Sequence, residues 1–115
     1  MRYVLLIYTN EADRPAWGTS EGDAESKAYE QFHGEITRRG LQSGEPLLRV
    51  AEAKSVRVRD GKAQVSDGPA AQTAEQLGGY YLVDGKDLDE ALELAAKVPG
   101  AKYGTIEVRP VLEFA

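Results

Sequence analysis

Two short segments of this chain are apolar on both alternating sides, and this feature most limits how the chain can fold. Residues 2–8 read Arg-Tyr-Val-Leu-Leu-Ile-Tyr, and residues 80–83 read Tyr-Tyr-Leu-Val. A strand with one face in water alternates apolar with polar side chains, because successive residues point to opposite faces. Both segments are therefore predicted to be central strands that are covered on both faces.

Two longer segments have helical spacing. The first is predicted to begin after a cap at Thr19 or Ser20 and to end near Arg39, where Gly40 stops it. The second begins at Asp87 with a capping-box-like Asp-Leu-Asp-Glu and ends at Pro99-Gly100. One helical turn is also predicted at Thr73–Gln76. The expected apolar faces of the two helices are Ala28, Tyr29, Phe32 and Ile36, and Leu88, Ala91, Leu92 and Ala95.

The remaining elements complete one α+β pattern. Asp60-Gly61 is typical of a two-residue hairpin turn and would pair Val56 with Val65 and Val58 with Ala63. Residues 41–50 predict an irregular strand or loop, and residues 103–109 predict a final alternating strand. The order is strand, helix, strand with an added hairpin, strand, helix, strand. It predicts a ferredoxin-like split βαβ sheet in a single domain over residues 1–115.

This topology places both helices on the same face of the sheet, so the second apolar face needs another cover. The hairpin and the loop that carries Trp17 are expected to supply part of it. A second copy of the chain is expected to supply the rest, which predicts a homodimer. The alternative is that the loops alone cover this face.

Composition narrows the chemistry. The chain has 115 residues, no cysteine and one histidine, so it has no disulfide or thiolate nucleophile, and we expect no metal or cofactor. Its net charge of −5 and the lack of a basic stripe argue against a nucleic-acid partner. The apolar start is too short for a membrane span or a standard signal peptide, which predicts a cytoplasmic protein without membrane contact.

His33 and Asp67 are the candidate catalytic residues. Histidine is the side chain that changes charge near neutral pH, and His33 lies at the edge of the first helix's apolar face. It is interpreted as a general acid or base, the alternative being a half-buried histidine with a hydrogen-bond partner. Asp67 would orient His33 or accept a substrate proton. The alternative for Asp67 is an Asx turn before Gly68-Pro69.

The candidate substrate-binding residues lie around these two. They are Tyr29, one helical turn before His33, Gly68 in the turn after Asp67, and Tyr80 and Tyr81 on opposite faces of their strand. For the two strand tyrosines the alternative is a place in the core. Gly78-Gly79 allows a close approach of another strand or of a ligand, and packing is the favoured reason.

The combined motifs resemble one known family across nearly the whole chain. Asp67-Gly68-Pro69, Glu75–Asp84 and Asp87–Leu92 closely resemble the YCII-related family, and within it the branch named for an Asp-Gly-Pro-Phe (DGPF) motif. The opening Met1–Tyr8 and the closing Ile106–Pro110 fit that branch too. The chain departs from the pattern at Ala70, where the branch usually has phenylalanine.

The resemblance implies a dimeric α/β-barrel arrangement, in which two ferredoxin-like sheets face each other. It also implies a His/Asp acid–base site, with the histidine on the first helix, where His33 lies. The family's aspartate stands in an Asp-Pro pair after the second helix, and this sequence has Val98-Pro99 there. Members of the branch are often encoded beside sigma factors, which raises a sigma factor as a partner.

Two classes of function follow. The first is a small-molecule enzyme that uses His33 and Asp67 in a cleft of a homodimer, for a lyase, isomerase or hydrolase reaction led by proton transfer. The second is a non-catalytic module that binds a metabolite or another protein, including a sigma factor. Contact between His33 and Asp67 in a solvent-open pocket would favour the first class.

Overall fold

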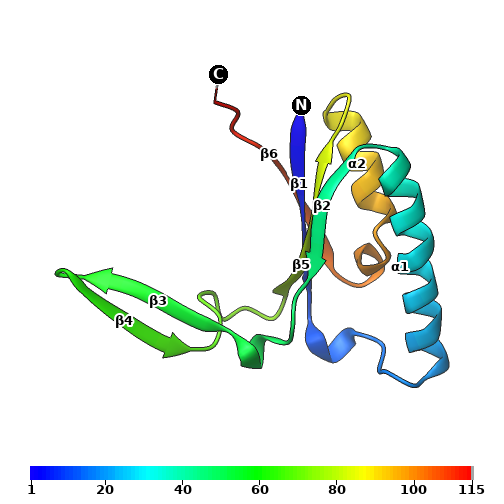
Figure 1. Ribbon diagram of the computed structural model, residues 1–115. Helices are drawn as coiled ribbons and strands as arrows, with labels where there is room; N and C mark the ends of the chain where they lie inside the picture. Colours follow the sequence, from blue (N-terminus) through cyan, green and yellow to red (C-terminus); the bar gives the residue numbers. More distant parts are fainter. Residues whose placement is uncertain (115) are drawn as a thin grey trace.

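The computed structural model describes residues 1–114 (Figure 1). It has six strands, two α-helices and three short 3-10 helices. In chain order these are β1 (Arg2–Thr9), η1 (Glu11–Asp13), α1 (Ser20–Arg38), β2 (Leu41–Pro46), η2 (Val50–Glu52), β3 (Lys54–Arg59), β4 (Lys62–Asp67), β5 (Gln76–Asp84), α2 (Leu88–Lys97), η3 (Pro99–Lys102) and β6 (Thr105–Pro110).

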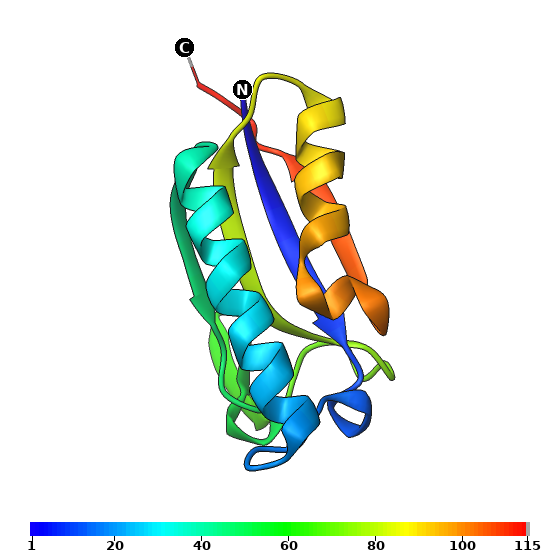
Figure 2. The same ribbon diagram turned by 90° about the vertical axis from the view of Figure 1, so that its right-hand side faces the viewer.

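Four strands form an antiparallel sheet in the order β2-β5-β1-β6. Both helices lie on one face of this sheet, side by side and roughly along the strands (Figures 1 and 2). The chain is thus α+β, as predicted, and the arrangement is compatible with a ferredoxin-like fold. β1 is a central strand, which agrees with the apolar character of both of its sides.

The core lies between the helices and the sheet. Alternate residues of β1 from Tyr3 to Thr9 are buried, and β5 adds Val83. Phe32 of α1 meets the Tyr81 ring edge-on, with ring centroids 5.4 Å apart. The largest side chains without exposed surface are Leu5, Ile36, Val83, Leu94 and Val98.

The buried stripe of α2 overlaps only in part with the predicted one. Leu88 and Leu92 were expected to be buried, but each is 47% exposed. The buried residues are Ala91, Leu94 and Ala95, with Val98 after the helix. These four recur at helical spacing around Ala91, whereas Leu92 lies on the flank of that stripe. Ala91 and Ala95 are thus buried as predicted, whereas Leu88 and Leu92 are not.

One other predicted element differs. Residues 73–76 form no helical turn, since Gln76 already begins β5 and its side chain donates to the backbone oxygens of Ala71 and Thr73. The prediction of an irregular strand or loop over residues 41–50 agrees with strand β2 (Leu41–Pro46), which has a register shift where it pairs with β5. Edge pairing with β5 is a long-range interaction that local sequence does not reveal.

The predicted hairpin is confirmed in its pairing register, but it does not lie over the sheet as expected. β3 and β4 pair Val56 with Val65 and Val58 with Ala63, around a turn with positive φ at Asp60 and Gly61. The hairpin was expected to help cover the open face of the sheet. Instead it extends away from the four-stranded sheet as an arm (Figure 1), so it leaves that face uncovered within the chain.

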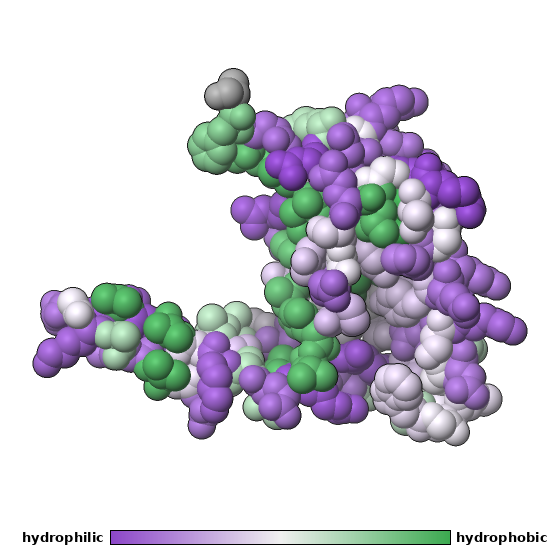
Figure 3. All heavy atoms as spheres, in the orientation of Figure 1, coloured by the Kyte–Doolittle hydropathy of each residue, from purple (hydrophilic) through white to green (hydrophobic). Residues whose placement is uncertain are grey.

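Apolar side chains gather on the open side of the sheet, on the arm and on the C-terminal tail (Figure 3). Val56, Val58 and Val65 of the arm are 61–68% exposed, and Phe114 of the tail is 89% exposed. The Trp17 side chain is 93% exposed, so its loop does not cover the sheet either. Among residues 1–114 no helix is long and apolar enough to cross a membrane.

A cluster of charged side chains links the C-terminal end of α1 to α2. The Arg39 guanidinium donates to the carboxylates of Glu35, Glu90 and Glu93 over 3.0–3.3 Å. Lys97 donates to Glu35 over 2.7 Å. The hydrogen bonds and charge of Arg39 lower the pKa of Glu93 to about 2 from an ordinary 4.5, and Lys97, with Arg39, lowers the pKa of Glu35.

This cluster predicts an acid-sensitive contribution to stability. Groups whose pKa is lower in the folded state stabilise it above the unfolded pKa and lose that effect as the pH falls toward the folded pKa. We expect Arg39→Gln to lower the melting temperature most at neutral pH, with a deficit that shrinks from about pH 4.5 to about pH 2. Circular-dichroism melts at several pH values measure this. Arg38→Gln, which removes an exposed neighbour without an ion pair among residues 1–114, is the control, and a deficit that does not change with pH would contradict the prediction.

Candidate functional site

A pocket of about 400 Å³ lies between α1 and the end of the sheet where β1 and β2 finish and β5 begins. This volume falls in the range of small-molecule sites. The pocket is lined from four directions: α1, the sheet, the loop before α1 and the segment before β6. The lining residues are Gly22, Asp23, Glu25, Ser26, Tyr29 and His33; Ile7, Thr9, Gly44, Glu45, Pro46, Gly78, Gly79, Tyr80 and Tyr81; Arg14, Pro15, Trp17 and Gly18; and Tyr103.

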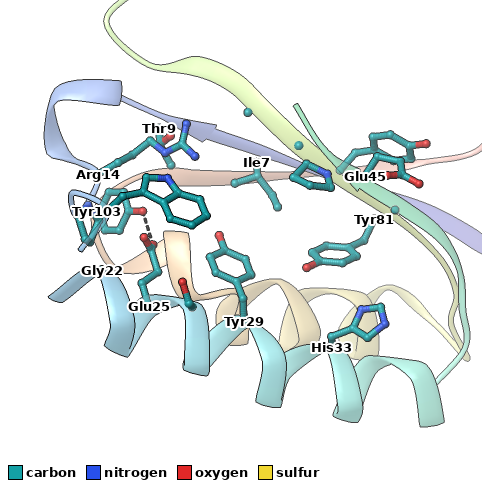
Figure 4. A pocket seen from close by; sticks show the side chains of 18 of the residues that line it. Ile7, Thr9, Arg14, Gly22, Glu25, Tyr29, His33, Glu45, Tyr81 and Tyr103 are labelled. Carbon is teal, nitrogen blue, oxygen red and sulfur yellow. Dashed lines mark hydrogen bonds between the residues drawn. The ribbon is translucent and has the colours of Figure 1, made fainter. Parts of the chain in front are cut away.

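One face of α1 supplies an acid, a phenol and an imidazole. Glu25, Tyr29 and His33 follow one another at four-residue intervals, so they stack along the same side of the helix. All three point from α1 into the space below the sheet (Figure 4). Thr19 fixes where the helix begins, because its hydroxyl accepts from the Gly22 N–H over 3.0 Å.

His33 lies in a solvent-open part of the pocket. Its side chain is exposed, and within residues 1–114 its imidazole has no hydrogen-bond partner. Apart from the backbone hydrogen bonds of α1, the hydrogen bond that residues 1–114 make to this residue runs from the Thr37 hydroxyl to the His33 backbone oxygen, at 2.7 Å. The imidazole is therefore available to a ligand. The alternative of a half-buried histidine held by a partner does not describe it.

Tyr29 and Tyr81 extend toward each other from opposite walls (Figure 4). The Tyr29 hydroxyl oxygen accepts from the Gly100 N–H over 3.2 Å, which leaves its own proton free to donate. Burial raises the pKa of Tyr29 to about 12, and burial also raises the pKa of Tyr81. Both phenols are thus neutral hydrogen-bond donors at ordinary pH.

Two glycines let strand β2 approach the pocket closely. A Cβ atom at Gly44 would lie 2.7 Å from Cδ1 of Tyr81, and one at Gly79 would lie 3.1 Å from the Glu45 oxygen. Packing against β2 therefore explains Gly79, as favoured from the sequence. A side chain at Gly44 would displace the Tyr81 ring, so this glycine keeps Tyr81 in place on the pocket wall.

Tyr80 borders the pocket, but its side chain lies on the other face of the sheet. It pairs with Leu6 and Glu45, whereas Tyr81 pairs with Leu5 and Gly44. Since neighbouring strand residues point to opposite faces and Leu5 is in the core, the Tyr80 ring belongs to the open face. Of the two strand tyrosines, Tyr81 is the one that faces His33 and Tyr29.

Asp67 and Gly68 do not line this pocket. Asp67 ends β4 at the base of the arm, where its side chain is 86% exposed and pairs with Lys54. Gly68, with a φ of +94°, turns the chain, and its N–H donates to the Ala53 oxygen over 2.8 Å. The carboxylate bonds Lys54 rather than the backbone of an Asx turn. The structure of one chain does not bring Asp67 to His33.

The structure places a different carboxylate in the pocket. Glu25 accepts a hydrogen bond from the Tyr103 hydroxyl, and burial together with this bond raises the pKa of Tyr103. Sequence reasoning missed both residues and the nearby Arg14. The four-residue spacing from Glu25 to Tyr29 and His33 was a visible signal. Tyr103 gave none, because it lies 78 residues away along the chain.

Within residues 1–114 no three or more His, Cys, Asp or Glu side chains are arranged as a metal site. What the pocket offers is an imidazole, the neutral phenols of Tyr29 and Tyr81, the carboxylates of Asp23, Glu25 and Glu45, and one guanidinium, that of Arg14. The fold and this pocket together define an α+β protein with a cleft of small-molecule size between a helix and a sheet.

The chain belongs to the YCII-related family. The model of the YCII-related domain matches residues 1–115. The chain is also similar to an uncharacterised protein of Rhizobium meliloti (strain 1021), with 34% identity over 118 residues that cover 96% of this chain and 92% of the relative. The family resemblance found in the sequence motifs is thereby confirmed.

Proposed function

We propose that this YCII-related protein is a small-molecule enzyme in which His33 transfers a proton as general acid or base. The observation that supports this most is the convergence of His33, Tyr29 and Tyr81 on one open pocket (Figure 4). A free imidazole can remove a proton from carbon next to a carbonyl group. Neutral phenols opposite it can donate hydrogen bonds to the oxygen that gains negative charge.

The reaction class that suits this arrangement is a lyase or isomerase reaction that begins with proton transfer, or a hydrolysis assisted by the same imidazole. Tyr29 and Tyr81 would hold the substrate oxygen, and His33 would act at the neighbouring carbon. The participation of Asp67 and Gly68 stays a prediction from the sequence, and their place at the base of the arm does not support it. Membership of the DGPF branch rests on Asp67-Gly68-Pro69 and stays a proposal as well.

We also propose that residues 1–115 act as one domain and pair into a homodimer of the dimeric α/β-barrel kind. The exposed apolar side chains of the open face, arm and tail support a second copy as the cover (Figure 3). Monomeric proteins rarely leave a continuous apolar surface of this kind in water. The pocket lies on the helix side of the sheet, so pairing through the open face leaves it accessible.

Hydrogen exchange tests the enzymatic proposal without a known substrate. The protein is incubated in deuterium oxide with a panel of small ketones and lactones. We expect at least one compound to take up deuterium next to its carbonyl group faster than in buffer, as measured by mass spectrometry. A panel without any protein-dependent uptake would reject proton transfer as the function.

The second candidate function is a non-catalytic interaction module. The observation that favours it is the arm, whose apolar face of Val56, Val58 and Val65 is exposed like a protein-binding surface. A sigma factor as the partner stays a prediction from the family resemblance. A pull-down with the full chain and with a chain in which these three valines are serine would test the arm as the contact.

A further inference from the structure

The two ends of the pocket differ in chemistry. His33 and Tyr81 lie at one end, and Glu25, Tyr103 and Arg14 lie toward the other (Figure 4). Eight residues of helix separate Glu25 from His33, which is about 12 Å along the axis at 1.5 Å per residue. A substrate that reaches from one end to the other therefore meets a second polar group besides the acid–base imidazole.

Glu25 is poised to accept hydrogen bonds. One of its carboxylate oxygens takes the proton of the Tyr103 hydroxyl. An ionised carboxylate has room for several donors, and no other residue among 1–114 donates to this one. A ligand group with N–H or O–H donors would fill the remaining hydrogen-bonding positions of this carboxylate. A positive charge on that group would strengthen these hydrogen bonds.

The aromatic side chains at this end suit a cation. Tyr29 and Tyr103 line the pocket beside Glu25, and Trp17, which also lines it, belongs to the loop that leads into the start of α1. Trp17 is 93% exposed, so its large ring is open to a ligand. A tryptophan ring attracts a nearby organic cation more strongly than the other aromatic rings do.

The charged residues at this end of the pocket also favour a positively charged ligand. Asp23 and Glu25 line the pocket together with one arginine, Arg14, which has no ion pair with any of residues 1–114. Two carboxylates against one cation leave this end negative at neutral pH. A negative, aromatic site selects against anions and for cations.

We propose that the end of the pocket formed by Glu25, Tyr103 and Trp17 binds a protonated amine carried on an apolar or aromatic body. This rests on the proposed function in that it assigns the substrate class of the same pocket. The amine would be held by Glu25 and covered by Trp17, while the body of the molecule extends past Tyr29 toward His33.

Three matched probes test the charge preference: benzylamine, benzyl alcohol and benzoate. They share one ring and differ in a positive, neutral or negative group. Trp17 is the only tryptophan of the chain, so its fluorescence reports binding at this end alone. We expect benzylamine to bind about tenfold or more tighter than benzyl alcohol, and benzoate to bind most weakly. Equal binding of all three, preference for benzoate, or no response to any of them would overturn the proposal.

Glu25→Gln tests the residue. Glutamine keeps an oxygen that can accept from Tyr103 and removes only the charge, so we expect it to lose the preference for benzylamine by about tenfold or more. Glu30→Gln is the matched control, because Glu30 is exposed on the same helix and does not line the pocket. An unchanged preference in Glu25→Gln would overturn the role of this carboxylate.

Trp17→Ala gives a second measurement that does not depend on the folding of Glu25→Gln. Its side chain is almost fully exposed, so the variant should fold normally. Calorimetry should show benzylamine binding weakened about threefold or more, and unchanged binding would overturn the contact with Trp17. Proton exchange and amine binding are separate measurements. Exchange without amine preference would overturn only this inference, and amine preference without exchange would overturn only the proposed enzymatic function.

Discussion

His33→Gln is expected to lower the rate of protein-dependent deuterium uptake by about a hundredfold to ten thousandfold, the usual contribution of a general acid or base. Glutamine retains hydrogen-bonding groups of similar size but cannot accept and release a proton near neutral pH. The His33 side chain is exposed, so its loss should leave the fold intact. Initial uptake rates on the best compound of the panel measure the effect.

Two further variants accompany this test, one in a phenol of the pocket and one outside the pocket as the control. Tyr81→Phe removes one donor to the developing oxyanion and should lower the rate by about a hundredfold, with little change in melting temperature. Gln31→Ala changes an exposed residue of α1 outside the pocket and should leave the rate unchanged. If His33→Gln exchanges protons as fast as the unchanged chain, His33 is not the acid or base and the proposed mechanism is wrong.

Local rules were sufficient for most elements. The Thr19 and Asp87 caps, the strand predicted from the continuous apolar run of β1 and the Asp60-Gly61 turn each depend on a few neighbouring residues, and the structure confirms all of them. Such features are set by backbone geometry and nearby side chains, which the sequence displays directly. The errors arose where packing against distant segments decides, as for residue 76, which β5 takes up, and for the flank position of Leu92 on α2.

The candidate site shows the same division. The helix pattern brought Tyr29 and His33 together correctly, because both lie on one face of α1. Which carboxylate lies in the pocket could not be chosen from local sequence, since nothing in the sequence around Asp67 or Glu25 shows which of them the fold brings there. The Asp-Gly-Pro turn drew attention to Asp67, whereas the fold puts Glu25 in the pocket with Tyr103 from the opposite end of the chain.

The open face of the sheet carries the second large expected effect. Leu82 pairs with Val4 on β1 and with Ser43 on β2, and it lies on the face away from the helices. The exposed valines of the arm extend from the same side of the molecule as this face (Figures 1 and 3). A second copy that packs against the open face would bury Leu82, and two-fold symmetry would bury it in both copies.

Leu82→Lys is therefore expected to convert a dimer into a folded monomer. An unpaired charge buried in an interface costs about 3–5 kcal/mol, and two such charges should weaken association by about a thousandfold or more. In the monomer the lysine amine can reach water from this half-exposed position, so the fold should survive. Sedimentation velocity measures the mass, and circular dichroism checks the fold. Leu92→Lys, at an exposed leucine on α2, is the matched control and should remain dimeric. A monomeric unchanged chain, or a dimeric Leu82→Lys, would show that the open face is not where two copies meet.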